Sequence, residues 1–306
     1  MKLITLPASL DERYFEPIAR ALLAPADERV LFDGTHVRWV DPYGLIGLLA
    51  VGQALRARGP ELPALKLPEN SEVASYMARM GFFTHAEPIF ELHGGQRRAR
   101  SEGASDVLLE ITAVNSHADV HAVVDHVNER GLRILTTQLA YPQREAFQFS
   151  VILSEMCQNI IEHAETGGWV ASQRYQWKKR LNRKVVIIAV MDLGVGFRHS
   201  LAPTHATRYP DAWTDAAALE AAFMHGHTRF HDPGRGQGIQ QIRKLVARWG
   251  GRISIRSGSA RIADVPAWDD GPRLEQNLPY LPGAQIGIVL PARVASEERV
   301  AAAPGS

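Results

Sequence analysis

The stretch VVIIAVMDLGVGF, residues 185–197, decides the fold of the second half of the chain. Residues 185–191 are all apolar, as in a strand that is buried on both faces of a sheet. The strand ends on Asp192, and the two glycines that follow, Gly194 and Gly196, let a backbone come close to a ligand. A buried aspartate at a strand end can accept a hydrogen bond from an exocyclic amine such as that of adenine. The stretch therefore predicts a sheet strand with a binding residue at its end.

A long helix is predicted before this strand, over residues 144–164, and its two sides differ. One wide face is apolar, while Glu155, Asn159 and Glu162 lie on the opposite side with His163 beside them. An asparagine oxygen suits Mg²⁺, which keeps several waters and takes other ligands from phosphates. A glutamate one turn earlier suits a group that orients or deprotonates a nucleophile beside a terminal phosphate. On its own, the polar stripe also fits a helix side that faces solvent.

A glycine-rich loop opens a further helix of the second half. The loop consists of Gly234, Arg235, Gly236, Gln237 and Gly238. Such a loop presents backbone amides and a helix N-terminus to an anion. Its third glycine comes one residue too early for a Rossmann fingerprint, and the sequence holds no Walker A lysine motif. The loop therefore predicts a phosphate site of another kind.

In their order and spacing, these three segments resemble the N box, the first glycine box and the second glycine box of the Bergerat ATP-binding fold. That superfamily includes gyrase, heat-shock chaperones, histidine kinases and MutL, and within it the chain is most similar to the anti-sigma factor serine kinase group. The likeness runs over about residues 107–293 and includes a closing strand at residues 283–291. It implies an α/β sandwich that binds ATP and Mg²⁺.

The resemblance also implies a role for each motif residue. Asp192 would hold the adenine, Asn159 the Mg²⁺, and Glu155 would act as the catalytic base. The phosphates would lie against residues 234–238, and residues 198–233 would form a mobile loop that acts as a lid over the nucleotide. The nucleotide-binding set implied in this way is Asn159, His163, Asp192, Gly194, Gly196, Gly234, Arg235, Gly236 and Gly238.

The first part of the chain alternates strands and helices, which predicts a small α/β layer. Predicted strands cover residues 30–32, 37–40 and 64–67, and predicted helices cover residues 44–58 and 71–80, the second capped by Ser71. Residues 31–49 resemble the signature of the STAS domain, the fold of the bacterial anti-sigma factor antagonists. The family's phosphorylatable serine falls on Pro42, and Tyr43 follows, so phosphorylation here is not implied. The alternative is an α/β cap without a regulated site.

The expected organisation is an α/β chain with two domains. It consists of a STAS-like domain at residues 1–92, a linker at 93–105, a Bergerat-fold ATP-binding domain at 106–293 and a flexible tail at 294–306. The linker stretch is rich in glycine and charge and lacks apolar periodicity, as exposed connections do.

Two other segments of the second domain carry predictions. Residues 119–130 are expected to form a helix that ends at Gly131. Residues 259–282 separate the last two strands and are expected to form a long loop with exposed Trp268 and Tyr280. We expect this loop to dock the amino-terminal domain or a protein partner, with a disordered insertion as the alternative.

Composition limits the classes of function. A formal net charge of +1 over 306 residues gives no overall field that would attract nucleic acid or anionic lipid. The sequence has no apolar run long enough to span a bilayer, and its start lacks the apolar region of a secretory signal. The single cysteine, Cys157, suits a reducing compartment and a packing role, so we expect a cytoplasmic protein.

Three histidines in the expected lid do not have the pattern of a metal site. His225, His227 and His231 are close in sequence, but apart from Asp232 no carboxylate or cysteine with ligand spacing accompanies them. We expect these side chains to contact solvent or phosphate.

The main functional hypothesis is an ATP-binding regulatory protein of the anti-sigma serine kinase type. It would use Mg-ATP and the lid to control a protein partner, either a STAS protein or a sigma-like regulator, and its catalytic form would be a kinase that phosphorylates a serine on that partner. One alternative is a nucleotide sensor without catalysis. Another is an ATP-hydrolysing clamp that forms a homodimer.

Overall fold

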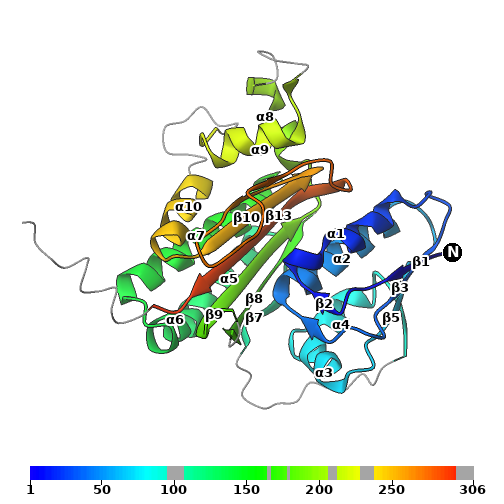
Figure 1. The fold of residues 1–306 in the computed structure, drawn as a ribbon, viewed down its shortest axis with the longest axis horizontal. Coiled ribbons are helices and arrows are strands. Elements are labelled where there is room, and N and C mark those ends of the chain that lie inside the picture. The colour runs from blue at the N-terminus through cyan, green and yellow to red at the C-terminus, as the bar shows by residue number, and fades with distance from the viewer. Residues whose placement is uncertain (95–106, 164–166, 178–179, 206–211, 228–237, 294–306) are drawn as a thin grey trace, which may run out of the picture.

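The structure is a computed structural model, and it describes residues 1–94, 107–163, 167–177, 180–205, 212–227 and 238–293. The described chain forms an amino-terminal lobe, residues 1–94, and a carboxy-terminal lobe, residues 107–293 (Figure 1). Parallel and antiparallel sheets occur together with helices, so the predicted α/β class is confirmed.

The amino-terminal lobe is built on a four-stranded parallel sheet in the order β1-β3-β5-β6. These strands are β1 (Lys2–Thr5), β3 (Val30–Asp33), β5 (Ala64–Lys66) and β6 (Glu91–His93). A small parallel pair, β2 (Ser9–Leu10) and β4 (Trp39–Val40), stands beside them. The helices are α1 (Glu16–Ala19), α2 (Pro42–Arg56), α3 (Ser71–Arg79) and α4 (Phe82–Ala86). Parallel strands need crossover connections: α1 lies in the connection from β1 to β3, α2 in that from β3 to β5, and α3 with α4 in that from β5 to β6.

Two details of this lobe differ from the sequence-based expectation. The predicted strand at 37–40 is reduced to β4, which pairs only with the two residues of β2. Helix α3 is capped by Asn70, whose Oδ1 accepts hydrogen bonds from the backbone N of Glu72 and Val73, and so Ser71 is not the cap. Both asparagine and serine are good caps, and the sequence alone does not choose between adjacent candidates.

The carboxy-terminal lobe is built on a seven-stranded antiparallel sheet in the order β12-β11-β10-β13-β9-β8-β7. The strands are β7 (Val107–Val114), β8 (Gly168–Trp177), β9 (Arg183–Asp192), β10 (Arg252–Gly258), β11 (Ala260–Asp264), β12 (Leu274–Glu275) and β13 (Leu281–Pro291). Helices α5 (His117–His126), α6 (Leu132–Gln138), α7 (Gln143–His163) and α10 (Gly238–Arg248) lie on one face, and α8 (Gly196–His205) and α9 (Asp215–Phe223) lie at one end (Figure 1).

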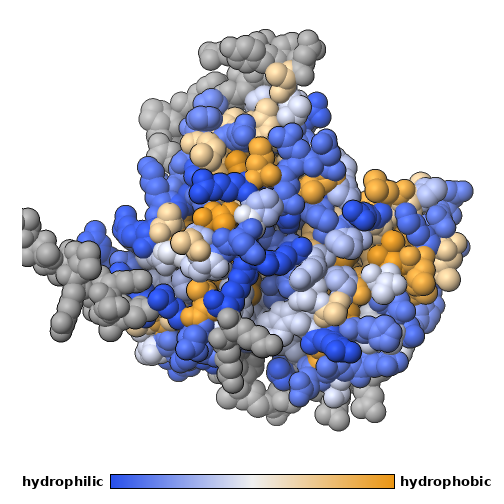
Figure 2. All heavy atoms as spheres, viewed as in Figure 1, coloured by the Kyte–Doolittle hydropathy of each residue, from blue (hydrophilic) through white to orange (hydrophobic). Residues whose placement is uncertain are grey.

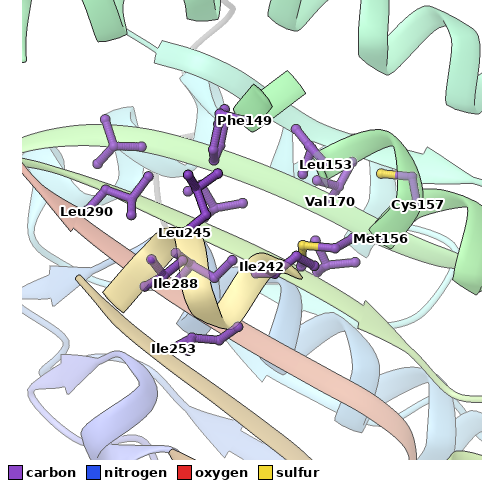
Figure 3. Packing of buried hydrophobic residues seen from close by; sticks show 14 of the residues in the cluster. Phe149, Leu153, Met156, Cys157, Val170, Ile242, Leu245, Ile253, Ile288 and Leu290 are labelled. Atoms are coloured by element: carbon purple, nitrogen blue, oxygen red, sulfur yellow. The ribbon is translucent and has the colours of Figure 1, made fainter. Parts of the chain in front are cut away.

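One apolar core joins the helices to this face of the sheet. Phe149, Leu153 and Met156 of α7 point toward Ile242 of α10 and Ile288 of β13, as Figure 3 shows. All five side chains are buried. This confirms the predicted apolar face of the long helix, because the residues recur every three or four positions along it.

The other face of the same sheet is covered by α2 of the amino-terminal lobe. Residues 42–52 of α2 are all buried, as expected of a helix that is apolar all round. On one side, Gly52 lies against the ring of Phe90 in its own lobe, and on the other, Tyr43 lies against Gly287 of β13. Helix α2 therefore lies between the two sheets and belongs to the cores of both lobes.

Two expectations about the carboxy-terminal lobe are wrong. The chain stays helical through Gly131, because a π-helical turn at Val127–Gly131 connects α5 to α6. Gly131 has an ordinary negative φ of −65°, and a Cβ there would lie 3.0 Å from a methyl carbon of Val127. The glycine therefore allows close packing in mid-helix.

The expected long loop at residues 259–282 instead contains β11 and β12, which extend the sheet beyond β10. Their segments are short and carry arginines and acids, so they lack the apolar alternation that marks a strand.

The surface is ordinary in its polarity. Hydrophilic residues dominate the face in Figure 2, and apolar ones gather on the amino-terminal lobe at the right. That lobe exposes Met1, Leu3 and Leu23. In the described segments, no helix combines the length and the hydropathy that a membrane crossing requires.

Candidate functional site

Asp192 is the last residue of β9, and its side chain is fixed by the backbone around it. Its Oδ1 accepts hydrogen bonds from the N–H of Gly194 at 2.8 Å and from the N–H of Ala284 at 3.3 Å. Burial raises the pKa of Asp192 to about 6, although these two hydrogen bonds lower it. Within the described residues both hydrogen bonds to this carboxylate go to Oδ1, so Oδ2 is the oxygen that could accept from a ligand. The site thus offers one oriented acceptor at the sheet end.

Gly283 lets the backbone pass close to this aspartate, and Gly196 packs beside Gly283. A Cβ on Gly283 would lie 2.5 Å from Oδ1 of Asp192 and 2.1 Å from its carbonyl oxygen. A Cβ on Gly196 would lie 2.7 Å from Oγ of Ser257. Gly283 has a φ of +78° and Gly196 a φ of +69°. Residues other than glycine rarely adopt a positive φ, so the backbone conformation favours glycine here in addition to the close contacts. Gly196 was anticipated from the sequence, whereas Gly283 was missed as a site residue.

The end of helix α7 lies over the end of β9. Gly168 of β8 is paired with Asp192 in the sheet, and a Cβ on Gly168 would lie 3.0 Å from a methyl carbon of Ile160. Asn159 is the residue before Ile160, so it stands on the part of α7 nearest the Asp192 end of the sheet. The described contacts give no ligand for Asn159, and its metal role stays a prediction.

Glu155 of α7 meets the start of α10. A Cβ on Gly238, the first residue of α10, would lie 2.8 Å from Oε2 of Glu155. Burial raises the pKa of Glu155 above its ordinary value. The structure therefore brings the predicted base to the helix N-terminus that the glycine-rich loop precedes. Of the other predicted site residues, Gly234, Arg235, Gly236 and the side chain of His163 lie outside the described residues.

The expected lid is not a simple loop. Its described part contains α8 and α9, and these helices are attached to the sheet. The N–H of Phe197 donates to Oγ of Ser257 at 3.1 Å, and Oδ2 of Asp215 accepts from both the N–H and the hydroxyl of Ser259. Helix α9 forms because Thr214 caps it and alanines, which favour helix, fill it.

A cavity of about 410 Å³ lies beside Val195 and Gly196, in the segment that follows Asp192. Gly196 and Gly283 border it on the side of the sheet, and Trp213 and Tyr280 add aromatic surface. Arg198 supplies a cationic side chain at its edge. Because Gly196 and Gly283 line it, the cavity lies next to the segments that hold Asp192, although Asp192 itself is not among the lining residues.

The structure describes three residues that were not assigned to the site, namely Cys157, His225 and His227. Cys157 is fully buried in the core, and burial raises its pKa to about 12, which confirms a packing role. His225 and His227 are exposed, with ring centroids 5.9 Å apart, and within the described segments no cluster of three metal-ligating residues is found. His231 lies outside the described residues.

The interface between the lobes contains a network of charged side chains. Nε of Arg256 donates to Oε1 of Glu16 at 2.9 Å, and Nη1 of Arg252 pairs with Oε2 of Glu12 at 2.5 Å. Burial alone raises the pKa of Glu12, but Arg252, with Arg261 and Ser254, brings it below its ordinary value. These acids come from the amino-terminal lobe and the arginines from β10 and β11.

The segment 259–282 takes part in this interface through its acids. Nη2 of Arg13 pairs with Oδ1 of Asp269 at 3.1 Å and also with Asp270. The segment therefore contacts the amino-terminal lobe, which is one of the two docking partners that we expected from the sequence. Trp268 has a different role: its Nε1 donates to the carbonyl of Gly250, within the carboxy-terminal lobe.

The start of α2 is buried in the same interface. Tyr43 is 2% exposed and lies edge-on to the ring of Phe15, with centroids 5.5 Å apart. Asp41 caps the helix through Gly44, and burial raises its pKa well above the ordinary range. Pro42, the position where the sequence likeness expects a serine, is buried as well. No kinase can reach this place while the lobes are docked.

Comparisons with known proteins add little. No family model matches the chain, and no curated protein matches it in sequence. Among solved structures, a mycobacterial sensor histidine kinase, MprB, aligns with 60% of this chain and 97% of its own at 16% identity, with a TM-score of 0.29. A likeness at this TM-score carries no argument, so the functional conclusion depends on the residues themselves.

Proposed function

We propose that the carboxy-terminal lobe is a Bergerat-type domain that binds Mg-ATP, and that the chain is a regulator of the anti-sigma serine kinase type. One observation carries the proposal. Segments that are far apart in sequence, Glu155 of α7, Asp192 of β9 and Gly238 of α10, gather around one end of the antiparallel sheet. These three residues belong to the three motifs that the sequence likeness assigns to ATP binding, so they are residues that such a site would need.

The adenine end of the proposed site rests on Asp192. Its Oδ2 is oriented to accept from the 6-amino group of adenine, because Oδ1 is held by Gly194 and Ala284. A Cβ on Gly283 would collide with Asp192 and one on Gly196 with Ser257, so these glycines let the segments around Asp192 pack closely and hold its carboxylate in place. A guanine base presents a carbonyl oxygen at the same position, so the site favours ATP over GTP.

The phosphate end rests on α10 and α7. The N-terminus of α10 attracts an anion, and the loop with Gly234, Arg235 and Gly236 would extend that cradle. Asn159 would give its side-chain oxygen to Mg²⁺, with His163 beside it. The metal would neutralise phosphate charge during transfer.

Glu155 would act as the base in the catalytic form. Its raised pKa brings it nearer to neutral pH, which favours proton acceptance. As a partner's serine oxygen forms a bond to the γ-phosphorus, Glu155 would accept the serine proton, and ADP would leave with the electron pair of the broken bond. The serine must come from a partner because the chain's own equivalent, Pro42, has no hydroxyl and is buried.

The amino-terminal lobe would be a STAS-like cover and not a switch of its own. Its parallel sheet with α2 capped at Asp41 fits the likeness seen in the sequence. The start of α2, which the likeness would make the regulated place, is held between the two lobes. Regulation would then act on a separate protein partner.

Calorimetry tests the nucleotide site. Asp192→Asn keeps the shape but exchanges an acceptor oxygen for a donor amide, so we expect ATP affinity to fall by about 1–3 kcal/mol. The matched control is Asp125→Asn on the exposed side of α5, which should leave the affinity unchanged. Equal ATP affinities for the wild type and Asp192→Asn would contradict the assignment.

A radiolabelled transfer assay separates the kinase from its alternatives. Glu155→Ala should keep ATP binding and lose turnover, whereas Asn159→Ala should weaken the Mg²⁺-dependent part of binding. Binding without turnover in the wild type would instead establish the sensor, and hydrolysis by a dimer in light scattering would establish the clamp.

A further inference from the structure

Arg256 is a fully buried arginine whose guanidinium group connects several parts of the molecule. Nε and Nη2 donate to the two carboxylate oxygens of Glu16 at 2.9 and 3.1 Å. Nη1 donates to the carbonyl of Gly258 at 3.1 Å and to Oε1 of Gln285 at 3.5 Å, and Nη2 also reaches the carbonyl of Pro279. The arginine therefore links the amino-terminal lobe to β10 and β13.

Gln285 continues this connection to the proposed nucleotide site. It is fully buried, and in the sheet it stands opposite Arg256 on one side and Met191 on the other. Its Nε2 donates to the carbonyl of Pro282 at 2.8 Å and to the carbonyl of Asp192 at 3.3 Å. The amide cannot be reversed without facing its N–H toward the guanidinium, so Arg256 fixes its orientation.

We propose that Arg256 and Gln285 are positioning residues that connect Glu16 of the amino-terminal lobe to Asp192, so that the contact of Glu16 with Arg256, and not docking of the lobe as such, sets the affinity and the base selectivity of the nucleotide site. The inference rests on the proposed function. Its physical basis is the segment 279–284, which supplies both Gly283 and Ala284 to the Asp192 site and is tied to Arg256 and Gln285 through its carbonyl groups. Without Glu16, Arg256 loses the charge that compensates its own.

The structure supplies a matched control in the pair of Glu12 and Arg252. This pair also joins the amino-terminal lobe to β10, and Glu12 accepts a further hydrogen bond from Ser254. Arg252 stands opposite Val289, away from the Asp192 end of β13. Within the described residues, Glu12 and Arg252 show no hydrogen bond to Gln285 or Asp192. Loss of this pair should loosen the lobe without reaching the site.

The test compares Glu16→Gln, Glu12→Gln and Gln285→Met in the full chain. Calorimetry measures affinities for ATP and GTP, and hydrogen exchange of α2 measures how firmly the lobe is docked. Both glutamate variants should lose protection in α2. We expect Glu16→Gln and Gln285→Met to lower ATP affinity by about tenfold and to reduce the preference for ATP over GTP, while Glu12→Gln stays within about twofold of the wild type.

The outcomes separate the inference from the function on which it rests. Similar losses of ATP affinity in Glu16→Gln and Glu12→Gln would overturn the positioning role, since a loosened lobe alone would then explain both. Wild-type nucleotide selectivity in Gln285→Met would overturn it too, even if Asp192→Asn weakens binding as expected. A wild type that binds neither nucleotide would overturn the proposed function itself.

Discussion

The two faces of the antiparallel sheet are covered in different ways. On one face, α7 and α10 of the same lobe pack with leucine, isoleucine and phenylalanine side chains, as in Figure 3. On the other face, α2 of the amino-terminal lobe packs over small residues, Ala171, Ala189 and Gly287, and arginine–glutamate pairs stand beside it. Hydrophobic burial is non-directional, whereas a hydrogen-bonded ion pair fits one geometry only. The comparison suggests that the first face supplies stability and the second specifies position.

The largest effect is expected from disrupting an arginine–glutamate pair on the sheet face that α2 covers. Glu16→Ala should lower the free energy of unfolding by about 3–5 kcal/mol, because Arg256 is fully buried and keeps an uncompensated charge. The double variant with Arg256→Met should recover most of this loss, since the uncompensated guanidinium group of Arg256 is then removed as well. Urea unfolding of the wild type, Glu16→Ala and the double variant measures both the loss of stability and its recovery. A double variant no more stable than Glu16→Ala would show that the pair supplies stability and not position.

The apolar face should respond to a cavity. Leu153→Ala removes a side chain that is 1% exposed, and we expect a loss of about 2–5 kcal/mol in the free energy of unfolding. Val151→Ala on the same helix is the control, because Val151 is 45% exposed and its truncation should change little. If Leu153→Ala and Val151→Ala lowered the free energy of unfolding by similar amounts, α7 would not be packed as described.

The site at the sheet end should show the opposite pH dependence from an ordinary ion pair. The pKa of Asp192 in the folded protein, about 6, lies above its unfolded value of 3.8. The ionised carboxylate therefore costs stability as pH rises from 3.8 through 6. Asp192→Asn removes this cost, so it should stabilise the ligand-free protein by about 1–3 kcal/mol at pH 7.5 and by little below pH 4. Thermal unfolding at the two pH values checks this, and a pH-independent effect would contradict it.

The smallest effect concerns an uncharged link between the lobes. The hydroxyls of Tyr76 and Tyr175 are 2.6 Å apart and partly buried. Tyr76→Phe should cost about 1 kcal/mol, because Tyr175 loses this partner, and the double variant with Tyr175→Phe should cost less than the single. Chemical unfolding of both variants checks the order. The reverse order would mean that the two hydroxyls act independently.

Much of the carboxy-terminal lobe was predictable because its elements are long and periodic. The helix expected at 144–164 is α7 at Gln143–His163, and the strand expected to end on Asp192 is β9. By contrast, β11 and β12 are short and polar, and the π-helical turn at Gly131 has no local signal. Local patterns predict elements whose periodicity extends over several turns or residues, and they miss those formed by pairing with a neighbour.

The residues of the candidate site also fall into those that the sequence predicted and those that it did not. Asp192, Gly194 and Gly196 are adjacent in sequence, so one motif revealed them. Gly283 and Gln285 come from a strand far along the chain and meet Asp192 only through the β9–β13 pairing. Their importance is a property of the folded sheet, and only a contact between distant residues reveals it.

The position of α2 between two sheets has a consequence for the evolution of the chain. A surface helix can drift in sequence on its exposed side, but residues 42–52 have no exposed side. Each substitution there must suit two partners at once, Phe90 and its sheet on one side and Gly287 and its sheet on the other. The two lobes are therefore not exchangeable modules: recombination that replaced one of them would have to bring a matching helix, and the pair is expected to be inherited together.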